Sequence, residues 1–350
     1  MKSLLAITQS FGSLVTGGQQ INSLIYAFLE KRNYRLTCSR DVLNQNNNLF
    51  FLVSLVLKIK ILSKYDKILI DSSLFPKVFL FVFLFRIFFD QKKIVVLHHH
   101  FVSATIIGWK KSVYGYLEKI LLKNCGFVIV FSPFTFSETS KIILKEKIHY
   151  VGLPFEKKEL CEHNPIDGRL LYVGTIEDRK GLIYLVKALS LLPKEMKERI
   201  LLNIVGKTIS NDYLTTLKKE VEKASLQNAV SFCGRLERDE LDHLYNTSSL
   251  FVFPSLYEGF GMVIIEAMQR SLPVIAFDNT AMPYTIKNNE NGIIVPNKDC
   301  RAFANAIKSL LENRSLYEKL SDGARNTGIK AQTYEEFENN IVNLIDIGVL

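Results

Sequence analysis

Two glutamates with seven residues between them are the strongest candidates for chemistry in this sequence. Glu258 and Glu266 lie in the segment PSLYEGFGMVIIEAMQRSLPVIA, where Gly259 and Gly261 follow the first of them. The apolar run LFVFP just before them is typical of a buried strand, so the segment predicts a strand, a glycine turn and a helix start. Unpaired N–H groups at a helix N-terminus bind anions, and glycines let a ligand approach the backbone. We therefore expect an anion site with two carboxylates beside it, rather than an ordinary strand–turn–helix unit.

The elements around this turn predict an α/β fold. Short apolar runs alternate with helical stretches along the chain, which is typical of parallel, doubly wound sheets that bind ligands at the carboxyl ends of their strands. The length of 350 residues favours two domains, and the turn-forming stretch 152–168 predicts the linker. We expect an N-terminal domain over 1–155, a C-terminal domain over 156–332, and a last helix at about 333–350 as a candidate to pack back on the first domain. The predicted strands are 3–8, 66–71, 93–99, 126–132, 169–174, 199–206, 229–234, 250–254, 272–277 and 292–296.

The net charge of +9 at pH 7 is unevenly distributed. Residues 1–150 hold 20 Lys and Arg against 8 Asp and Glu, a net charge of +12, whereas the remaining residues hold 24 and 27, a net charge of −3. A basic half suits nucleic acid, an anionic membrane or a phosphorylated substrate. Because no DNA- or RNA-binding motif accompanies it, we expect no nucleic-acid partner and favour the other two.

Two segments of the basic half, 49–62 and 73–90, are strongly apolar. Only eight uncharged residues separate Lys77 from Arg86, and a membrane-spanning helix needs about 20, so neither segment is expected to cross a membrane. Either they are buried helices that cover a sheet, or their Phe and Leu side chains enter a membrane interface while Lys and Arg meet anionic headgroups. Both can hold at once. Packing is the default expectation for Trp109, which has no motif around it.

Cysteines and histidines give no metal signal. The five cysteines stand far apart without a C-x-x-C pair, which indicates reduced thiols in the cytosol rather than a zinc site or a disulfide scaffold. His98, His99 and His100 follow a predicted strand, where alternate side chains point to opposite faces, so they cannot all face one ion. The stretch MKSLLAITQSFG predicts a first strand rather than a signal peptide, and we expect a cytoplasmic protein.

The segment LYNTSSLFVFPSLYEGFGMVIIEAMQRSLPVIA resembles the signature of retaining glycosyltransferases of the GT-B fold, in particular family 4 (glycosyltransferase group 1). Glu258 and Glu266 match the E-x7-E motif of that family. VGTIEDRKGLIYLVKAL resembles its phosphate-binding loop, with Lys180 at the lysine position, TGGQQINSLIYAFLEKRNYRL resembles its N-terminal Gly-Gly turn, and VVLHHH resembles the strand that ends in a histidine. The resemblance covers nearly the whole chain and implies two Rossmann-like domains that face each other across a cleft.

This resemblance implies a site for a UDP- or GDP-linked sugar. Lys180 and Arg179 would face the diphosphate, because cationic donors suit phosphate oxygens. Arg179 matters here because Thr175 stands where many members of the family have an arginine. The chain has no D-x-D motif, so we expect no metal and no cofactor. Backbone amides of the glycine turn would supplement the two cations; they belong to Gly259, Phe260, Gly261 and Met262.

The resemblance also implies roles for the carboxylates and for one histidine. Glu266 would bind the ribose hydroxyls, and Glu258 would bind hydroxyls of the transferred sugar. The strand-end histidine would contact the sugar, and the alignment leaves His98 or His99, with His99 preferred. The expected catalytic residues are therefore Glu258, Lys180 and His99.

The implied function is transfer of a sugar from a nucleotide sugar to a hydroxyl, with retention at the anomeric carbon. Gly17 and Gly18 would bring the N-terminal domain's backbone to the same phosphates or sugar. The expected acceptor is a glycan or lipid-linked acceptor of surface-polysaccharide synthesis, with peripheral contact to the inner membrane face. Two alternatives stay open. A nucleotide-sugar epimerase of similar architecture would need a base placed for elimination, and a non-catalytic partner subunit that binds nucleotide or lipid would show erosion of Lys180, Glu258 or Glu266.

Overall fold

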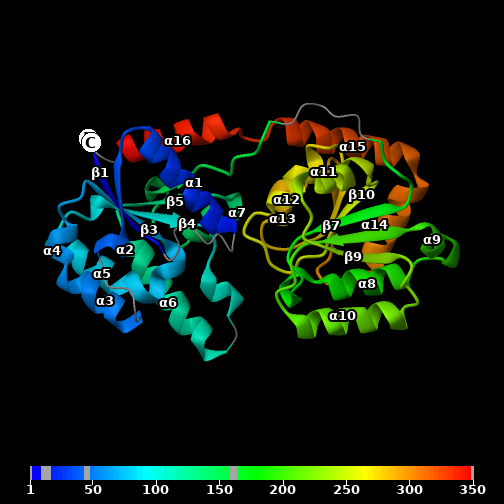
Figure 1. Ribbon diagram of the computed structural model, residues 1–350, viewed down its shortest axis with the longest axis horizontal. Helices are drawn as coiled ribbons and strands as arrows, with labels where there is room; N and C mark the ends of the chain where they lie inside the picture. The colour runs from blue at the N-terminus through cyan, green and yellow to red at the C-terminus, as the bar shows by residue number, and fades with distance from the viewer. Residues whose placement is uncertain (1, 9–16, 43–47, 107, 158–163, 348–350) are drawn as a thin grey trace. The chain divides into compact units, whose positions relative to one another are not determined.

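The computed structural model describes residues 2–8, 17–42, 48–106, 108–157 and 164–347 (Figure 1). The chain divides into two compact units, one formed by 1–154 with 332–350 and the other by 155–331. We call them the N-terminal unit and the C-terminal unit. Each boundary lies one residue before the one expected from the sequence, and part of the expected linker, 158–163, lies outside the described residues.

The N-terminal unit is built on a six-stranded sheet in the order β2-β1-β3-β4-β5-β6. Its paired strands are all parallel. The chain moves outward from β1 to β2 and then reverses to β3, so the order of the strands changes direction between β1 and β3. The strands are β1 (Ser3–Ile7), β2 (Arg35–Cys38), β3 (Lys67–Asp71), β4 (Ile94–His98), β5 (Phe127–Val130) and β6 (Ile148–Tyr150).

Helices cover both faces of this sheet (Figure 1). One face packs its Ile and Val side chains against α3 (Asn48–Leu57), α5 (Phe75–Phe88) and α6 (Trp109–Asn124). The other face carries α1 (Gly17–Lys31) and the C-terminal α16 (Tyr334–Ile347), which lie beside each other. Glu338 of α16 pairs with Arg32 at 2.7 Å and with Lys31 at 3.0 Å. The last helix of the chain therefore packs on the N-terminal unit.

The Phe-rich α5 is both a core helix and an exposed one. Phe75, Phe81 and Phe85 are fully buried, whereas Phe83 and Phe88 are 44% and 68% exposed. The expected helix over 49–62 is broken at Lys58 into α3 and α4 (Ile59–Leu62). Within the described part of the chain, no helix combines the length and the apolar character that crossing a bilayer requires.

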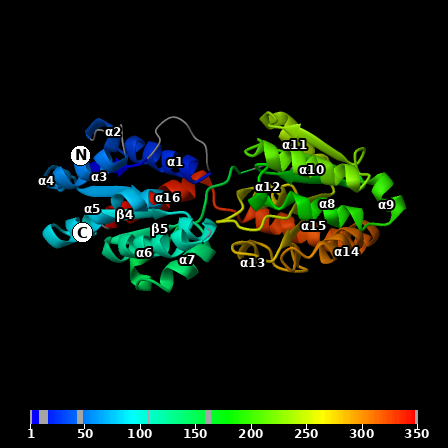
Figure 2. The same cartoon turned by 90° about the horizontal axis from the view of Figure 1, so that it is seen from below.

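The C-terminal unit repeats the architecture with a sheet in the order β12-β11-β10-β7-β8-β9, again with parallel pairs. Figure 2 shows α8 (Leu182–Ser190) between α10 (Asn211–Lys223) and α14 (Cys300–Glu312). The order of the strands reverses between β7 and β10. The strands are β7 (Arg169–Val173), β8 (Leu201–Val205), β9 (Val230–Gly234), β10 (Leu250–Phe253), β11 (Val274–Phe277) and β12 (Gly292–Val295). The remaining helices of this unit are α9 (Lys194–Arg199), α11 (Arg238–Thr247), α12 (Met262–Met268), α13 (Met282–Thr285) and α15 (Arg314–Ile329).

The predicted α/β fold of two doubly wound parallel sheets is confirmed. The sequence pattern missed β2 and β6, which have few fully buried residues and therefore lack the continuous apolar run of the central strands. It also missed short helices such as α9 and α13, which span one or two turns and show no full amphipathic period.

Candidate functional site

The candidate site of the C-terminal unit lies where its sheet reverses direction. In a doubly wound sheet, the loops after two neighbouring strands diverge at such a point and leave room for a ligand. Here the strands are β7 and β10, which pair directly. The loop after β7 carries Arg179 and Lys180, and the loop after β10 carries Glu258. Residues almost 80 positions apart in the chain are thereby brought together.

A close backbone approach joins these two loops. Gly181 has φ +64°, and a Cβ at this position would overlap the carbonyl oxygen of Pro254. The Leu256 N–H also donates to the carbonyl oxygen of Arg179 at 2.9 Å. Only glycine combines the left-handed backbone with this contact, so the lysine loop is fixed on the strand–turn segment that leads to Glu258.

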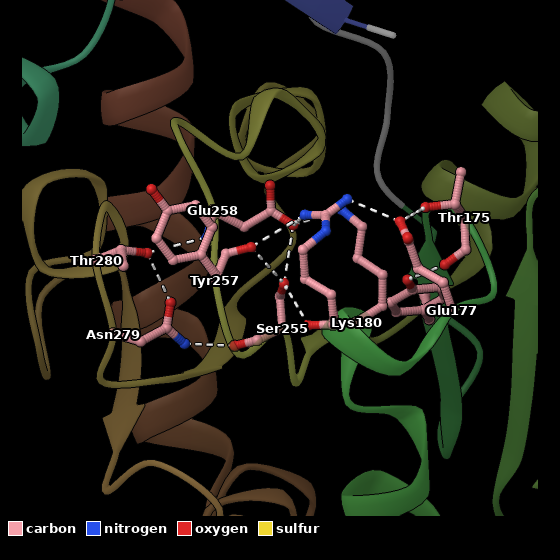
Figure 3. Close-up of polar contacts among 10 residues, drawn as sticks. Thr175, Glu177, Lys180, Ser255, Tyr257, Glu258, Asn279 and Thr280 are labelled. Atoms are coloured by element: carbon pink, nitrogen blue, oxygen red, sulfur yellow. Dashed lines mark hydrogen bonds and ion pairs between the residues drawn. The ribbon is translucent and has the colours of Figure 1, made fainter. Parts of the chain in front are cut away.

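One carboxylate oxygen of Glu258 contacts both cations of the site (Figure 3). Glu258 Oε1 accepts from Lys180 Nζ, from Ser255 Oγ at 2.8 Å and from Arg179 at 3.3 Å. Lys180 and Glu258 are each only 9% exposed, and the Lys180 ammonium lies 5.5 Å from the centre of the Phe253 ring. Glu258 Oε2 takes no part in these bonds. The structure thus pairs the two candidate phosphate-binding cations with the candidate sugar-binding carboxylate.

Arg179 is held from both sides. Its guanidinium donates to the Tyr257 carbonyl oxygen at 3.0 Å and to Glu177 at 2.8 Å, and the Thr175 hydroxyl donates to the same Glu177 oxygen at 2.7 Å. Burial alone would raise the pKa of Glu177, but the hydrogen bond from Thr175 and the charge of Arg179 outweigh it and lower the pKa. Thr175 and Glu177 therefore fix the position of Arg179.

A second pair of residues supports Glu258 from the loop after β11. The Glu258 N–H donates to Thr280 Oγ1 at 3.0 Å, and Thr280 donates to Asn279 Oδ1 at 2.9 Å. Asn279 Nδ2 in turn donates to the Ser255 carbonyl oxygen. Thr280 has φ +35°, an uncommon backbone for a residue with a Cβ. The sequence analysis assigned none of these residues; the only signal was a polar triplet directly after an apolar strand.

The glycine turn leads into α12, which has seven residues. Gly261 lies directly before it with φ +82°, so a non-glycine residue would be strained there. The Phe260 ring lies 6.0 Å from the Phe155 ring, and Gly259 and Met262 are partly exposed. The predicted amides are thus next to Glu258 in the chain, and their role as anion donors stays a prediction.

Glu266 lies on α12 and has partners of its own. Tyr245 donates to Glu266 Oε2 at 3.2 Å, and the Arg270 guanidinium stacks over the Tyr245 ring at 4.6 Å and pairs with Asp242. Burial raises the pKa of Glu266, against the effect of the Tyr245 hydrogen bond. One oxygen of Glu266 is therefore fixed by a buried tyrosine, which the sequence analysis did not identify.

In the N-terminal unit, the two candidate histidines point to opposite faces of the sheet. His98 is 1% exposed, lies with its ring edge-to-face on Phe101 at 4.5 Å, and has no partner for either ring nitrogen among the described residues. Burial lowers the pKa of His98 to about 3. His99 lies on the face of α1, where its ring is stacked on Phe131 at 4.5 Å. A Cβ on Gly18 would come within 3.2 Å of that ring, so the structure brings Gly18 and His99 together.

Two further expectations concern Gly17 and Trp109. The space around Gly17 is open, since a Cβ there would have no heavy atom within 4 Å, and its expected approach to the donor stays a prediction. The expectation that Trp109 is packed is wrong, because it lies at the start of α6 and is 74% exposed. Within the described ranges, no three His, Cys, Asp or Glu side chains gather as metal ligands would.

Comparison with known proteins identifies the family. A family model described as glycosyl transferases group 1 matches residues 157–327. Residues 157–327 belong to the glycosyl transferases group 1 family. This matched region contains the Lys180, Arg179 and Glu258 cluster and also Glu266.

Known relatives agree with this assignment. O-antigen chain mannosyltransferase B of Escherichia coli is 33% identical over 152 residues, which are 43% of this chain and 39% of that protein. Sucrose-phosphate synthase from Thermosynechococcus elongatus is 21% identical, with a TM-score of 0.77 over 99% of both chains. Anabaena HepE in complex with UDP and glucose is 15% identical, with a TM-score of 0.75 over 99% of this chain and 100% of that one. At these identities the two structures establish the fold alone, and that fold is GT-B.

Proposed function

We propose that this group 1 glycosyltransferase transfers a sugar from a UDP- or GDP-linked donor to a hydroxyl of a glycan or lipid-linked acceptor, in the synthesis of a surface polysaccharide. The observation that carries the proposal is the convergence of Lys180 and Arg179 on Glu258 at the reversal point of the C-terminal sheet. The HepE complex with UDP and glucose supports a nucleotide-sugar donor, and the O-antigen mannosyltransferase supports a polysaccharide product.

The cluster suits the charge that develops during transfer. Breaking the anomeric C–O bond leaves a diphosphate and an oxocarbenium-like carbon, so preorganised cations beside the leaving group lower the barrier. Lys180 and Arg179 supply two such cations, which is why we propose that no metal and no cofactor take part. Glu258 Oε2 is available to a hydroxyl of the sugar, while Oε1 keeps the cations in place.

We further propose that the configuration at the anomeric carbon is retained. In this proposal, the acceptor hydroxyl attacks from the face that the diphosphate leaves, and a leaving phosphate oxygen takes the acceptor proton. Glu266 binds the ribose hydroxyls with the oxygen that Tyr245 leaves free. We also propose that His99 and Gly18, which lie against each other, contact the sugar.

The membrane part of the proposal rests on α6. Trp109, Val113 and Tyr116 are 74%, 42% and 66% exposed, and the exposed Lys110 and Lys111 lie between them in the chain. Aromatic rings and lysines on one helix suit the interface of an anionic membrane. We propose that the protein is cytoplasmic and binds the inner face of the cell membrane through this helix.

Thermal-shift measurements with UDP-, GDP- and ADP-sugars test the donor. A ligand present at about 100 times its Kd should stabilise the folded protein by about 2.7 kcal/mol. We expect such a shift with one class of nucleotide sugar and a smaller one with the others. If no nucleotide sugar raises the melting temperature, the proposed function is wrong.

A further inference from the structure

A buried polar chain in the N-terminal unit has no place in the roles assigned so far. Asn22 on α1 and Asp71 at the end of β3 are 1% and 4% exposed. Asn22 Nδ2 donates to Asp71 Oδ2 at 3.0 Å, and Asn22 Oδ1 lies 2.8 Å from His99 Nε2. Asn22 lies on the helix after β1, Asp71 ends β3, and His99 directly follows β4, so the three residues come from both sides of the point where this sheet reverses direction.

The chemistry of these groups fixes the direction of each hydrogen bond. Asp71 Oδ1 accepts from the Ser73 N–H at 2.9 Å, so both carboxylate oxygens face N–H donors. A carboxylate has no proton to give, and therefore the amide nitrogen of Asn22 must face Asp71 and its oxygen must face His99. The amide oxygen can only accept. The proton of a neutral His99 ring must then be on Nε2, which leaves Nδ1 as an acceptor.

The ring is also fixed in place and kept neutral. The His99 ring is stacked on Phe131 with an interplanar angle of 14°. Gly18 lies close to Cγ and Cδ2 of the same ring. Thr135 Oγ1 donates to the His99 carbonyl oxygen at 3.0 Å and holds the backbone. Burial lowers the pKa of His99 to about 4, although the charge of Asp71 acts in the opposite direction. The described residues provide no hydrogen-bond partner for Nδ1.

We propose that Asn22 and Asp71 are positioning residues, which hold His99 as the Nε2–H tautomer so that Nδ1 accepts a hydrogen bond from a hydroxyl of the sugar. The proposal rests on the proposed function, in which His99 contacts the sugar. In this proposal, the neutral His99 ring accepts a hydrogen bond from the hydroxyl and gives no proton to the substrate. His99 is partly buried, and an acceptor on such a ring selects for a donor group, because a sugar without that hydroxyl would leave Nδ1 unpaired in the complex.

The tautomer can be measured without any substrate. Imidazole ¹⁵N chemical shifts, recorded at pH 7 on protein labelled in its six histidines and assigned with His99→Gln, distinguish protonated from unprotonated ring nitrogens. We expect a protonated Nε2 and an unprotonated Nδ1 at His99. A protonated Nδ1, or a charged ring, would overturn the proposal. Because no donor sugar is present, this result is independent of whether the protein is a glycosyltransferase.

A substitution at Asp71 tests whether the hydrogen bonds from Asp71 through Asn22 set the tautomer of His99. In Asp71→Asn, the side chain at 71 has an amide in place of a carboxylate at nearly the same volume, so Asn22 can turn and donate to His99. We expect signals from a second His99 population with Nδ1 protonated. An unchanged His99 spectrum in folded Asp71→Asn protein would show that Asp71 does not set the tautomer.

A double-mutant cycle tests whether Asn22 acts through His99. Asn22→Leu should lower kcat/KM about tenfold in the parent, and less than about twofold in a His99→Ala background. Equal losses in both backgrounds would overturn the positioning role. If Asn22→Leu does not fold, the Asp71→Asn spectrum decides. If the parent transfers no sugar, the proposed function fails while the ¹⁵N measurement still decides the tautomer.

Discussion

At the scale of single residues, substitutions at Lys180 and Glu258 should have different effects, the first on binding of the donor and the second on transfer of the sugar. Lys180→Ala removes a cation expected on the diphosphate and should weaken UDP binding about 10- to 100-fold, since hydrogen bonds to charged groups contribute about 1.5–3 kcal/mol. Glu258→Gln removes the charge that pairs with Lys180 and Arg179 but no cation. It should bind UDP as tightly as the parent and lower turnover about 100-fold.

Calorimetric titration with UDP and a transfer assay distinguish these two effects. Lys187→Ala is the matched control, because Lys187 is an exposed lysine on α8 a few residues after Lys180. Its affinity for UDP should equal that of the parent. Parent-like UDP binding by Lys180→Ala would contradict the assignment of the diphosphate site.

His98 predicts a dependence of stability on pH. Its folded-state pKa of about 3 lies below the ordinary value of 6.5, so between these pH values the unfolded chain binds a proton that the folded protein does not. The free energy of unfolding should therefore fall by up to about 1.4 kcal/mol per pH unit as the pH decreases below 6.5. His98→Phe removes this contribution and keeps a ring against Phe101.

Urea unfolding at pH 6.5 and 5.5, followed by circular dichroism, measures this difference between the parent and His98→Phe. We expect the parent to lose about 1 kcal/mol more than His98→Phe over this interval. Equal losses would mean that His98 binds its proton equally in both states.

At the scale of elements, substitutions of two glycines distinguish the energetic cost of a strained backbone from the cost of a steric clash. Gly181 and Gly234 have similar left-handed backbones, with φ +64° and +68°. A Cβ on Gly234 would meet nothing within 4 Å, whereas one on Gly181 would overlap the Pro254 carbonyl oxygen. Gly234→Ala should cost about 1–2 kcal/mol for the strained backbone. Gly181→Ala should cost about 1–3 kcal/mol more, because the loops after β7 and β10 must move apart.

Urea unfolding of both variants measures the two costs, and UDP titration adds a second readout. Displacement of the β7 loop moves Lys180, so Gly181→Ala should also weaken UDP binding, while Gly234→Ala should not. If both variants lose the same stability and the same affinity, the close approach of the two loops does not position the site.

At the scale of the whole molecule, the charge of +12 over residues 1–150 predicts binding to anionic membranes. The protein should float with vesicles that contain anionic lipid at low salt and be released at high salt. Lys110→Gln/Lys111→Gln should weaken this binding about 30-fold, at about 1 kcal/mol per lysine near the surface. Lys218→Gln/Lys219→Gln, an equal change at two exposed lysines of α10, is the control.

Vesicle flotation of the parent and both double variants measures this contribution. Equal weakening by the two pairs would indicate a general charge effect without a role for α6. An absence of salt-reversible binding by the parent would refute the membrane proposal and leave the donor site unaffected.

Much of the fold followed from local sequence patterns, whereas the partners in the site did not. Continuous apolar runs predicted the central strands because parallel strands are buried on both faces. The spacing of Glu258 and Glu266 pointed to a site directly, and the family resemblance added Lys180 to it. Ser255, Asn279 and Thr280 gave no comparable signal, since each acts on a residue that the fold, not the sequence, places beside it.

The sequence by itself determined the central strands, most of the longer helices and the residue types available for chemistry, because periodicity, glycine and charge are local properties of the chain. Only the tertiary structure decided that Arg179 and Lys180 share one oxygen of Glu258, and that His99 rather than His98 lies against Gly18. The physical reason is the order of the strands. Pairing β7 with β10 joins loops almost 80 residues apart, and the pleat of β4 sends neighbouring histidines to opposite faces.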